Sequence, residues 1–483
     1  MDHATKRTFN FVNLNHPDDL KDEETQLRIR RLAMTEVGKA RRKPKTRRER
    51  NEIVLELRSP HEKPVDTGIE RLGAGLTDPF STYPVDVDDS GRILLANIFD
   101  TDSLHSTQLR GSWYPVGLES AAAFHNVLAN SQNFLFQKAN GYFPSQDDTL
   151  ALVYHHKALR YASEMMKDVS KHQSDEMLGA VASFMCHQAL LGNFAGTDWH
   201  KHRSALISMI RGRGGYNALR KEHLRITLTW SDLLGSFTQD IPPLVPMPQK
   251  WETHSRSPPN SPRPISTMSL LWKQLLPMQI DWISVFDDTA QLISLDQAFN
   301  EKQLVLAITS GSWMEPTIYR LLEIRPLHHS TDREHLIEEV CRLGTLLFLA
   351  PLWRIMGQSP VRTTAITRNL LLLLTKNMIE WNELKPLLLW VVYMAAIETQ
   401  DLGERSQLVF MLAVLMSGMQ LLEWQDIMKL IKSVLWVDKV YGGTDDLIRD
   451  EVLQIVIQNP MRAVVVATPP TFLDDFQSEV EQH

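Results

Sequence analysis

Apolar residues recur at steps of three and four positions through most of this 483-residue chain, and this spacing restricts its fold more than any other feature. It places apolar side chains on one face of an α-helix, whereas a half-buried strand needs alternation at every second residue. No alternating segment of strand length competes with it. The sequence therefore predicts an all-α body over residues 92–460. An arm at 1–58 and a linker at 59–91 precede the body, and an acidic tail at 461–483 follows it.

Three helices can be bounded in the first half of the body from their capping residues. The first follows the pair Ser145 and Asp148, and its expected buried face is Leu152, Leu159, Ala162, Met166 and Val169. The second begins at Ser174 and ends at Gly192-Asn193, with an expected buried face of Leu178, Val181, Met185 and Ala189. The third covers about residues 198–211 and ends at the glycines that follow.

Further along the chain, a proline-rich segment separates these helices from a second apolar region. Residues 242–264 contain eight prolines, so this segment is predicted to be a loop. The most apolar stretches, 387–397 and 408–422, are each shorter than the roughly 18 residues that a membrane span needs. They predict buried core helices and no membrane association. Helical spacing also recurs around Ile366 and Leu370, and around Ile448 and Val452.

The sequence contains none of the common catalytic or metal-binding motifs. The chain has no GxSxG, P-loop, complete GxGxxG or HExxH motif. Cys186 and Cys341 are its only cysteines and lie more than 150 positions apart, so they cannot form a multi-thiolate cluster. We therefore predict no catalytic residue, no metal site, no cofactor and no stoichiometric zinc.

The histidines next to other potential ligands or nucleophiles are predicted to be structural. Adjacent side chains on a helix diverge, which argues against a Cys186-His187 nucleophile and base and against a metal site at His155-His156. His335 and Glu338 could share a helix face with His328 and His329 nearby, but polar residues at a helix start explain this group better.

The basic charge of the chain is concentrated at its N-terminus. Residues 1–58 carry 15 Lys/Arg against 10 Asp/Glu, which leaves 36 against 48 for the rest of the chain. A short helix is expected at 22–38, directly before a dense cluster in a largely disordered arm. This basic arm consists of Lys39, Arg41, Arg42, Lys43, Lys45, Arg47, Arg48 and Arg50. Such a cluster predicts nuclear import first and non-specific phosphate contact second, with a solvated linker as the alternative.

Three segments together carry a family resemblance. They are FNFVNLNHPDDLKDEETQLRIRRLAMTEVGKARRK at 9–43, TDPFSTYPV at 77–85 and WHKHRSALISMIRGRGGYNAL at 199–219. In order and spacing they resemble the fungal-specific transcription factor family, in the branch related to binuclear zinc-cluster regulators. The most specific match is a helix and glycine turn, whose motif residues are Trp199, His202, Leu206, Met209, Arg213, Gly214 and Gly215.

The resemblance implies a helical regulatory domain, which in relatives often follows a six-cysteine zinc cluster that reads DNA. Two distant cysteines cannot form that cluster. We therefore expect a nuclear transcription-associated regulator, present also in the cytoplasm if import is incomplete. Its expected partners are DNA, through non-specific phosphate contacts, and coregulators or a DNA-binding partner protein. The alternatives are a helical scaffold or coregulator that binds only proteins, and an enzyme with an unfamiliar helical site.

The C-terminal tail combines aromatic and acidic residues. Phe472, Leu473 and Phe476 interleave with Asp474 and Asp475. This composition predicts an exposed segment that docks a coactivator, with a frayed tail as the alternative.

Overall fold

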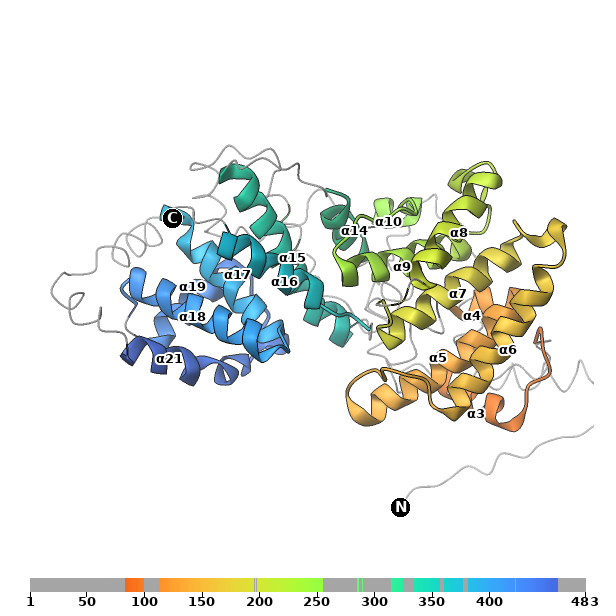
Figure 1. Ribbon diagram of the computed structural model, residues 1–483, viewed down its shortest axis with the longest axis horizontal. Coiled ribbons are helices and arrows are strands. Elements are labelled where there is room, and N and C mark those ends of the chain that lie inside the picture. The colour runs from red at the N-terminus through yellow and green to blue at the C-terminus, as the bar shows by residue number, and fades with distance from the viewer. Residues whose placement is uncertain are drawn as a thin grey trace, which may run out of the picture. The chain divides into compact units, whose positions relative to one another are not determined.

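The computed structural model describes residues 83–99, 111, 113–194, 196, 198–254, 285, 289, 314–324, 333–356, 360–376, 381–421 and 423–458. Within these residues the regular structure is helical, and none of them forms a strand (Figure 1). This confirms the all-α prediction. The first helices are α3 (Asp89–Ile98), α4 (Tyr114–Glu119), α5 (Ala121–Asn140), α6 (Thr149–Met165), α7 (Asp175–Leu191), α8 (Asp198–Gly212), α9 (Glu222–Gln239) and α10 (Gln249–His254). The later ones are α14 (Glu315–Glu323), α15 (Arg333–Met356), α16 (Thr364–Lys376), α17 (Lys385–Glu398), α18 (Leu402–Gly418), α19 (Trp424–Val434), α20 (Asp438–Tyr441) and α21 (Arg449–Gln458).

Polar caps determine where several of these helices begin. Ser174 accepts a hydrogen bond from the Met177 amide at 3.1 Å, which starts α7 where the sequence predicted. Asp148 caps α6 through the Ala151 amide at 2.8 Å. Asp88 caps α3 in the same way, so the first described helix begins at Asp89, slightly before the expected boundary at residue 92. Each cap satisfies a backbone donor that has no partner inside its own helix.

The helices of the first half pack around α5 and α7. Helices α5, α6 and α7 lie side by side, and α7 also contacts α8 and α9 (Figure 1). The expected face of α7, from Leu178 to Ala189, is buried, and most of its other residues are buried too. A helix covered on nearly every side in this way is a core element of its bundle.

Helix α6 is turned differently from the prediction. The structure buries Ala151, Tyr154, Ala158 and Met165, whereas Leu152 is 43% exposed and Val169 is 79% exposed. The Tyr154 hydroxyl donates to Asp88, and His155 Nδ1 lies 3.0 Å from the Asn126 side-chain oxygen. These bonds fix the rotation of α6, and its small alanines allow close approach to α5. The predicted buried face was therefore wrong by about one residue.

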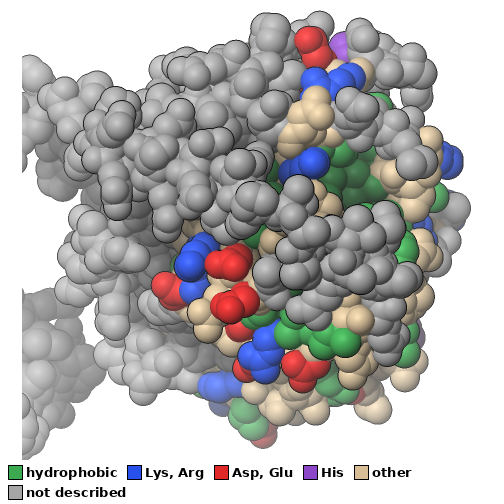
Figure 2. Space-filling model, turned by 90° about the vertical axis from the view of Figure 1, so that its left-hand side faces the viewer, with side chains coloured by type: hydrophobic (Ala, Val, Ile, Leu, Met, Phe, Trp, Pro, Cys, Tyr) green, Lys and Arg blue, Asp and Glu red, His purple; other side chains and the backbone are tan. Residues whose placement is uncertain are grey.

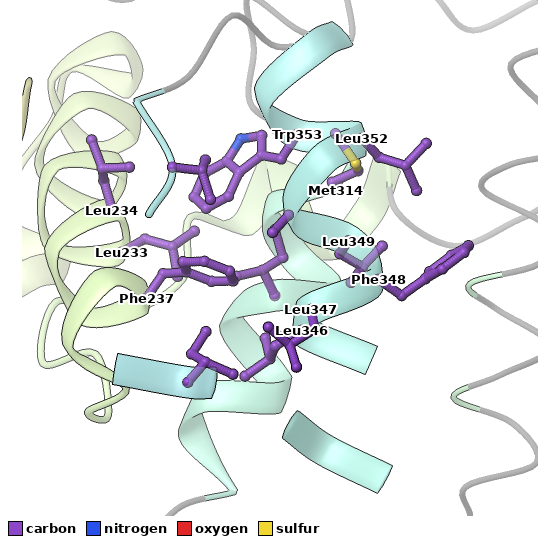
Figure 3. Packing of buried hydrophobic residues seen from close by; sticks show 14 of the residues in the cluster. Leu233, Leu234, Phe237, Met314, Leu346, Leu347, Phe348, Leu349, Leu352 and Trp353 are labelled. Atoms are coloured by element: carbon purple, nitrogen blue, oxygen red, sulfur yellow. The ribbon is translucent and has the colours of Figure 1, made fainter. Parts of the chain in front are cut away.

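A buried apolar contact joins α9 to α14 and α15. Leu233 and Phe237 of α9 point toward α15, where Trp353 lies beside them, whereas Phe348 points to the opposite side of α15 (Figure 3). Helix α14 also packs on α9. The rings of Phe237 and Trp353 meet edge to face with centroids 5.5 Å apart. Each such side chain contributes on the order of 1.5–3 kcal/mol when fully buried, so this contact is a principal stabilising element.

The two most apolar stretches form α17 and α18, and α17 is buried along most of its length, as expected of a core helix. No helix in the described part of the chain is long and apolar enough to cross a membrane.

The segment predicted to be a proline-rich loop, 242–264, contains a short helix. Residues 249–254 form α10, so the expectation of a continuous loop was wrong there. Trp251 is fully buried, and α10 packs on α14. Burial of this indole favours a local helical turn after Pro248, whose carbonyl accepts from the Trp251 amide at 2.9 Å. Residues 255–264 lie outside the described residues.

Candidate functional site

The motif helix is α8, and its buried stripe anchors it to α9. Trp199, Leu206 and Ile210 are buried, while His202 and Met209 are half-buried. Gly235 of α9 makes room for the indole, because a Cβ at that position would lie 2.0 Å from the Trp199 ring. The motif residues on this helix therefore act first as packing residues.

Arg203 is the central polar residue of this helix, and the sequence analysis did not single it out. Its Nε donates to Asp232 Oδ1 at 2.6 Å, and a terminal nitrogen donates to the Pro242 carbonyl at 2.6 Å. The same nitrogen reaches Ser236 Oγ at 3.2 Å, and the guanidinium lies over the Trp199 ring. Arg203 was detectable, because it shares the i, i+4, i+7, i+11 stripe with Trp199, Leu206 and Ile210.

Asp232 extends this contact to the chain after α9. Its second carboxylate oxygen accepts from the amides of Leu244 at 2.5 Å and Val245 at 2.8 Å. The carboxylate is fully buried, so its negative charge is stable only because the guanidinium and these two amides surround it. Arg203 and Asp232 thus fix α8, α9 and residues 242–245 to one another.

The glycine turn ends α8 where the sequence predicted. Gly214 and Gly215 have φ of 94° and 95°, a region that side chains with a Cβ rarely adopt. The Gly215 amide closes the turn by donating to the Ile210 carbonyl at 2.9 Å. The turn directs Arg213 back to the start of α7, where its guanidinium pairs with Asp175.

An open polar pocket of about 630 Å³ lies beside that ion pair. Lys221 Nζ lies 2.9 Å from Glu119 Oε2 and 3.4 Å from Asp175 Oδ2, and His223 Nε2 lies 3.2 Å from Glu119 Oε1. The hydrogen bond that Lys221 donates to the Glu119 carboxylate raises the pKa of Lys221. Acidic and basic groups pair with one another here, so the pocket does not present one sign of charge to a ligand. Its ion pairs instead hold the starts of α7 and α9 together.

A network of histidines and amides, most of them buried and His155 half-buried, lies between α5, α6 and α7. His187 Nε2 is 2.8 Å from Asp147 Oδ2, and His187 Nδ1 is 2.8 Å from Asn130 Oδ1. The His155 ring stacks on His187 with centroids 4.0 Å apart. Burial lowers the pKa of His155 to about 3 and that of His125 to about 4, so both are neutral at physiological pH. The network orients these helices in the core.

The two cysteines are buried in separate helices. Cys186 of α7 and Cys341 of α15 are free thiols, and burial raises the pKa of each. Cys186 Sγ contacts the Asn130 amide at 3.9 Å, whereas the ring nitrogens of His187 bond to Asn130 and Asp147. A thiol held neutral in this way is a packing group rather than a nucleophile or a metal ligand.

The other candidate metal-binding and basic residues of the sequence lie partly within and partly outside the described residues. His335 and Glu338 lie on α15, while His328 and His329 fall outside the described residues. Among the residues with described positions, no group of three His, Cys, Asp or Glu is arranged to hold a metal ion. The helix expected at 22–38, the eight charges of the basic arm and the tail at 461–483 also fall outside.

The comparisons with known proteins give one family. A family model described as the fungal-specific transcription factor domain matches residues 94–434, from α3 to the end of α19. The motif helix and the glycine turn lie inside this match, and the basic arm and the tail lie outside it. No curated protein and no solved structure matches the chain.

Proposed function

The chain belongs to the fungal-specific transcription factor domain family, and from this premise we propose that it acts in the nucleus as a transcription regulator. The match over residues 94–434 is the observation that carries the proposal, because it covers nearly the whole helical body. Membership of this family favours a regulator over an enzyme. The buried thiols of Cys186 and Cys341 and the neutral imidazoles of His125 and His155 are in keeping with that assignment.

The basic arm provides the link to the nucleus and to DNA in this proposal. Eight of the twelve residues at 39–50 are Lys or Arg, whereas the rest of the chain beyond residue 58 is net acidic. When such a cluster binds the phosphate backbone of a nucleic acid, condensed counterions are released, and this favours binding whatever the base sequence. The arm therefore supplies affinity and import, and the helical body does not supply them.

Sequence-specific targeting comes from a partner protein in this proposal. The two cysteines of the chain are buried in α7 and α15, so they cannot contribute to a zinc module that reads bases. The helical body would then act through protein contacts, as a rigid platform joined by buried ion pairs such as that of Arg203 with Asp232.

The test is to replace the eight Lys/Arg of the basic arm with glutamine in the full chain. If about six charges engage duplex DNA, the log-affinity against log-salt slope of the unaltered protein is near −5. The variant should lose most of this slope and most of its nuclear fraction. The matched control removes eight exposed charges from the body, by glutamine at Arg92, Lys138, Arg160, Lys167, Lys171, Lys201, Arg211 and Arg220.

Three outcomes separate the possibilities. Loss of both readouts in the arm variant but not in the control supports the proposal. A variant that stays nuclear and keeps the slope contradicts it and makes the arm a linker. A protein that is nuclear but binds no DNA at any salt concentration supports the alternative, a coregulator that acts only through protein contacts.

A further inference from the structure

An apolar groove lies between α16, α17 and α18, and we name it the α16–α18 groove. Its volume is about 670 Å³, and its walls include Trp381, Leu388, Val392, Phe410, Met411 and Val414. The residues that line it include no Lys, Arg, Asp or Glu. Figure 2 shows one face of the molecule, where hydrophobic side chains line a hollow and a second hydrophobic patch lies beside charged side chains.

Helix α18 forms one wall of the groove because it is apolar on two faces. Leu408, Leu412 and Met416 are buried, whereas Phe410 is 57% exposed and Val414 is 48% exposed. Phe410 and Val414 lie one helical turn apart on the groove side. Large apolar side chains that are exposed together on a concave surface are typical of a binding site.

The chain itself has a segment that can reach this groove. Helix α21 packs against α18 and ends at Gln458, and 25 residues follow it in the 483-residue sequence. The 13 residues from Asn459 to Thr471 can span roughly 43 Å when extended. Helix α18, with 17 residues, is only about 25 Å long. The chain length therefore permits Phe472 to reach α18.

The side chains of this segment complement the groove. In a helical turn, the spacing of Phe472, Leu473 and Phe476 would place them on one face, the pattern by which an amphipathic segment enters an apolar groove. Residues 468–483 contain Asp474, Asp475, Glu479 and Glu481 but no Lys or Arg. The lining of the groove carries no charged side chain, so the acidic residues of the segment would face solvent while its three apolar side chains meet the groove.

We propose that the chain's own C-terminal segment, residues 472–479, binds in the α16–α18 groove as a helical turn with Phe472, Leu473 and Phe476 facing inward. In this position the tail is masked, and a partner that binds the same three side chains must displace it. The proposal goes beyond the assigned role in transcription and depends on neither DNA binding nor nuclear import, so it can fail or succeed independently of them.

The first experiment measures binding of a fluorescent peptide of residues 468–483 to the full chain by anisotropy. In one variant, serine replaces Phe472, Leu473 and Phe476, so that the groove is vacated. A tethered segment has an effective concentration on the order of 1 mM. If the Kd of the free peptide is on the order of 0.1 mM, the tail of the unaltered chain competes with the peptide. The unaltered chain should then bind the peptide about tenfold more weakly than this variant does. Equal peptide affinity for the two proteins overturns the proposal.

The second experiment changes the groove in the vacated variant. Phe410→Asp places a charge on the apolar wall and should weaken peptide binding at least about tenfold. Leu402→Asp is the matched control, because it adds the same charge to the same helix at a position that is 79% exposed and does not line the groove. Unchanged affinity with Phe410→Asp overturns the groove as the site. Val414→Asp repeats the test, and circular dichroism verifies that each variant is folded.

A third measurement distinguishes a tail bound within one chain from a tail exchanged between chains. Cysteines at Val414 and Phe476 in the full chain should form an intramolecular disulfide on mild oxidation, while the native Cys186 and Cys341 remain buried. In the control, the cysteine is introduced at Leu152 of α6, which is also exposed, and not at Val414. This cysteine should form no disulfide with the one at Phe476. If the disulfides form mainly between chains, at rates that rise with protein concentration, the tail does not bind within its own chain.

Discussion

Removal of the Asp232 carboxylate tests whether the buried ion pair with Arg203 holds α8 and α9 together. In Asp232→Ala the guanidinium loses its 2.6 Å partner but remains enclosed, because Arg203 is only 8% exposed. Loss of one partner of a buried pair costs about 3–5 kcal/mol. The amides of Leu244 and Val245 also lose their acceptor, which places the expected loss toward the upper end of this range.

The assay is urea unfolding followed by circular dichroism at 222 nm. Lys201→Ala is the surface control, since Lys201 lies 3.2 Å from Asp198 and both side chains are more than half exposed. It should change the free energy of unfolding by less than about 0.5 kcal/mol. The double variant Arg203→Met/Asp232→Leu removes both charges and should recover at least half of the loss, because it leaves no buried charge uncompensated. A loss of unfolding free energy in Asp232→Ala no greater than that in Lys201→Ala would contradict a stabilising role of this buried ion pair.

Three further predictions concern the turn, the histidines and metal content. Gly215→Ala forces a Cβ into φ of 95° and should cost about 1–2 kcal/mol in thermal unfolding, whereas Gly196→Ala should be close to neutral because no positive φ constrains it. Burial lowers the folded-state pKa of His155 to about 3 and of His125 to about 4, so the unfolded chain binds more protons between about pH 4 and 6.5. The free energy of unfolding should therefore fall as the pH drops through this window. In His155→Gln the free energy should depend less steeply on pH. An equally steep dependence in the variant would count against a neutral imidazole at His155. Purified protein should retain less than one zinc ion per chain after dialysis against a weak chelator, measured by elemental analysis, because Cys186 and Cys341 are buried in different helices.

The candidate site could be predicted only in part. The motif at 199–219 indicates α8, its apolar stripe and the turn at Gly214 and Gly215, because caps, periodicity and glycine conformation act over a few neighbouring residues. The partner of Arg203 could not be read in this way. Asp232 lies 29 positions away, and only the packing of α8 on α9 brings the two charges together.

The sequence by itself determined that the described chain is helical, where α7 and α8 begin and end, and that the stretch at 387–397 is a core helix. Tertiary structure decided the rotation of α6, the pairing of His187 with Asn130 across 57 positions, and the exposure of Phe410 on α18. The physical reason is that local spacing determines which side chains share a helix face. Which face is buried depends on hydrogen bonds and close contacts with helices that are distant in sequence.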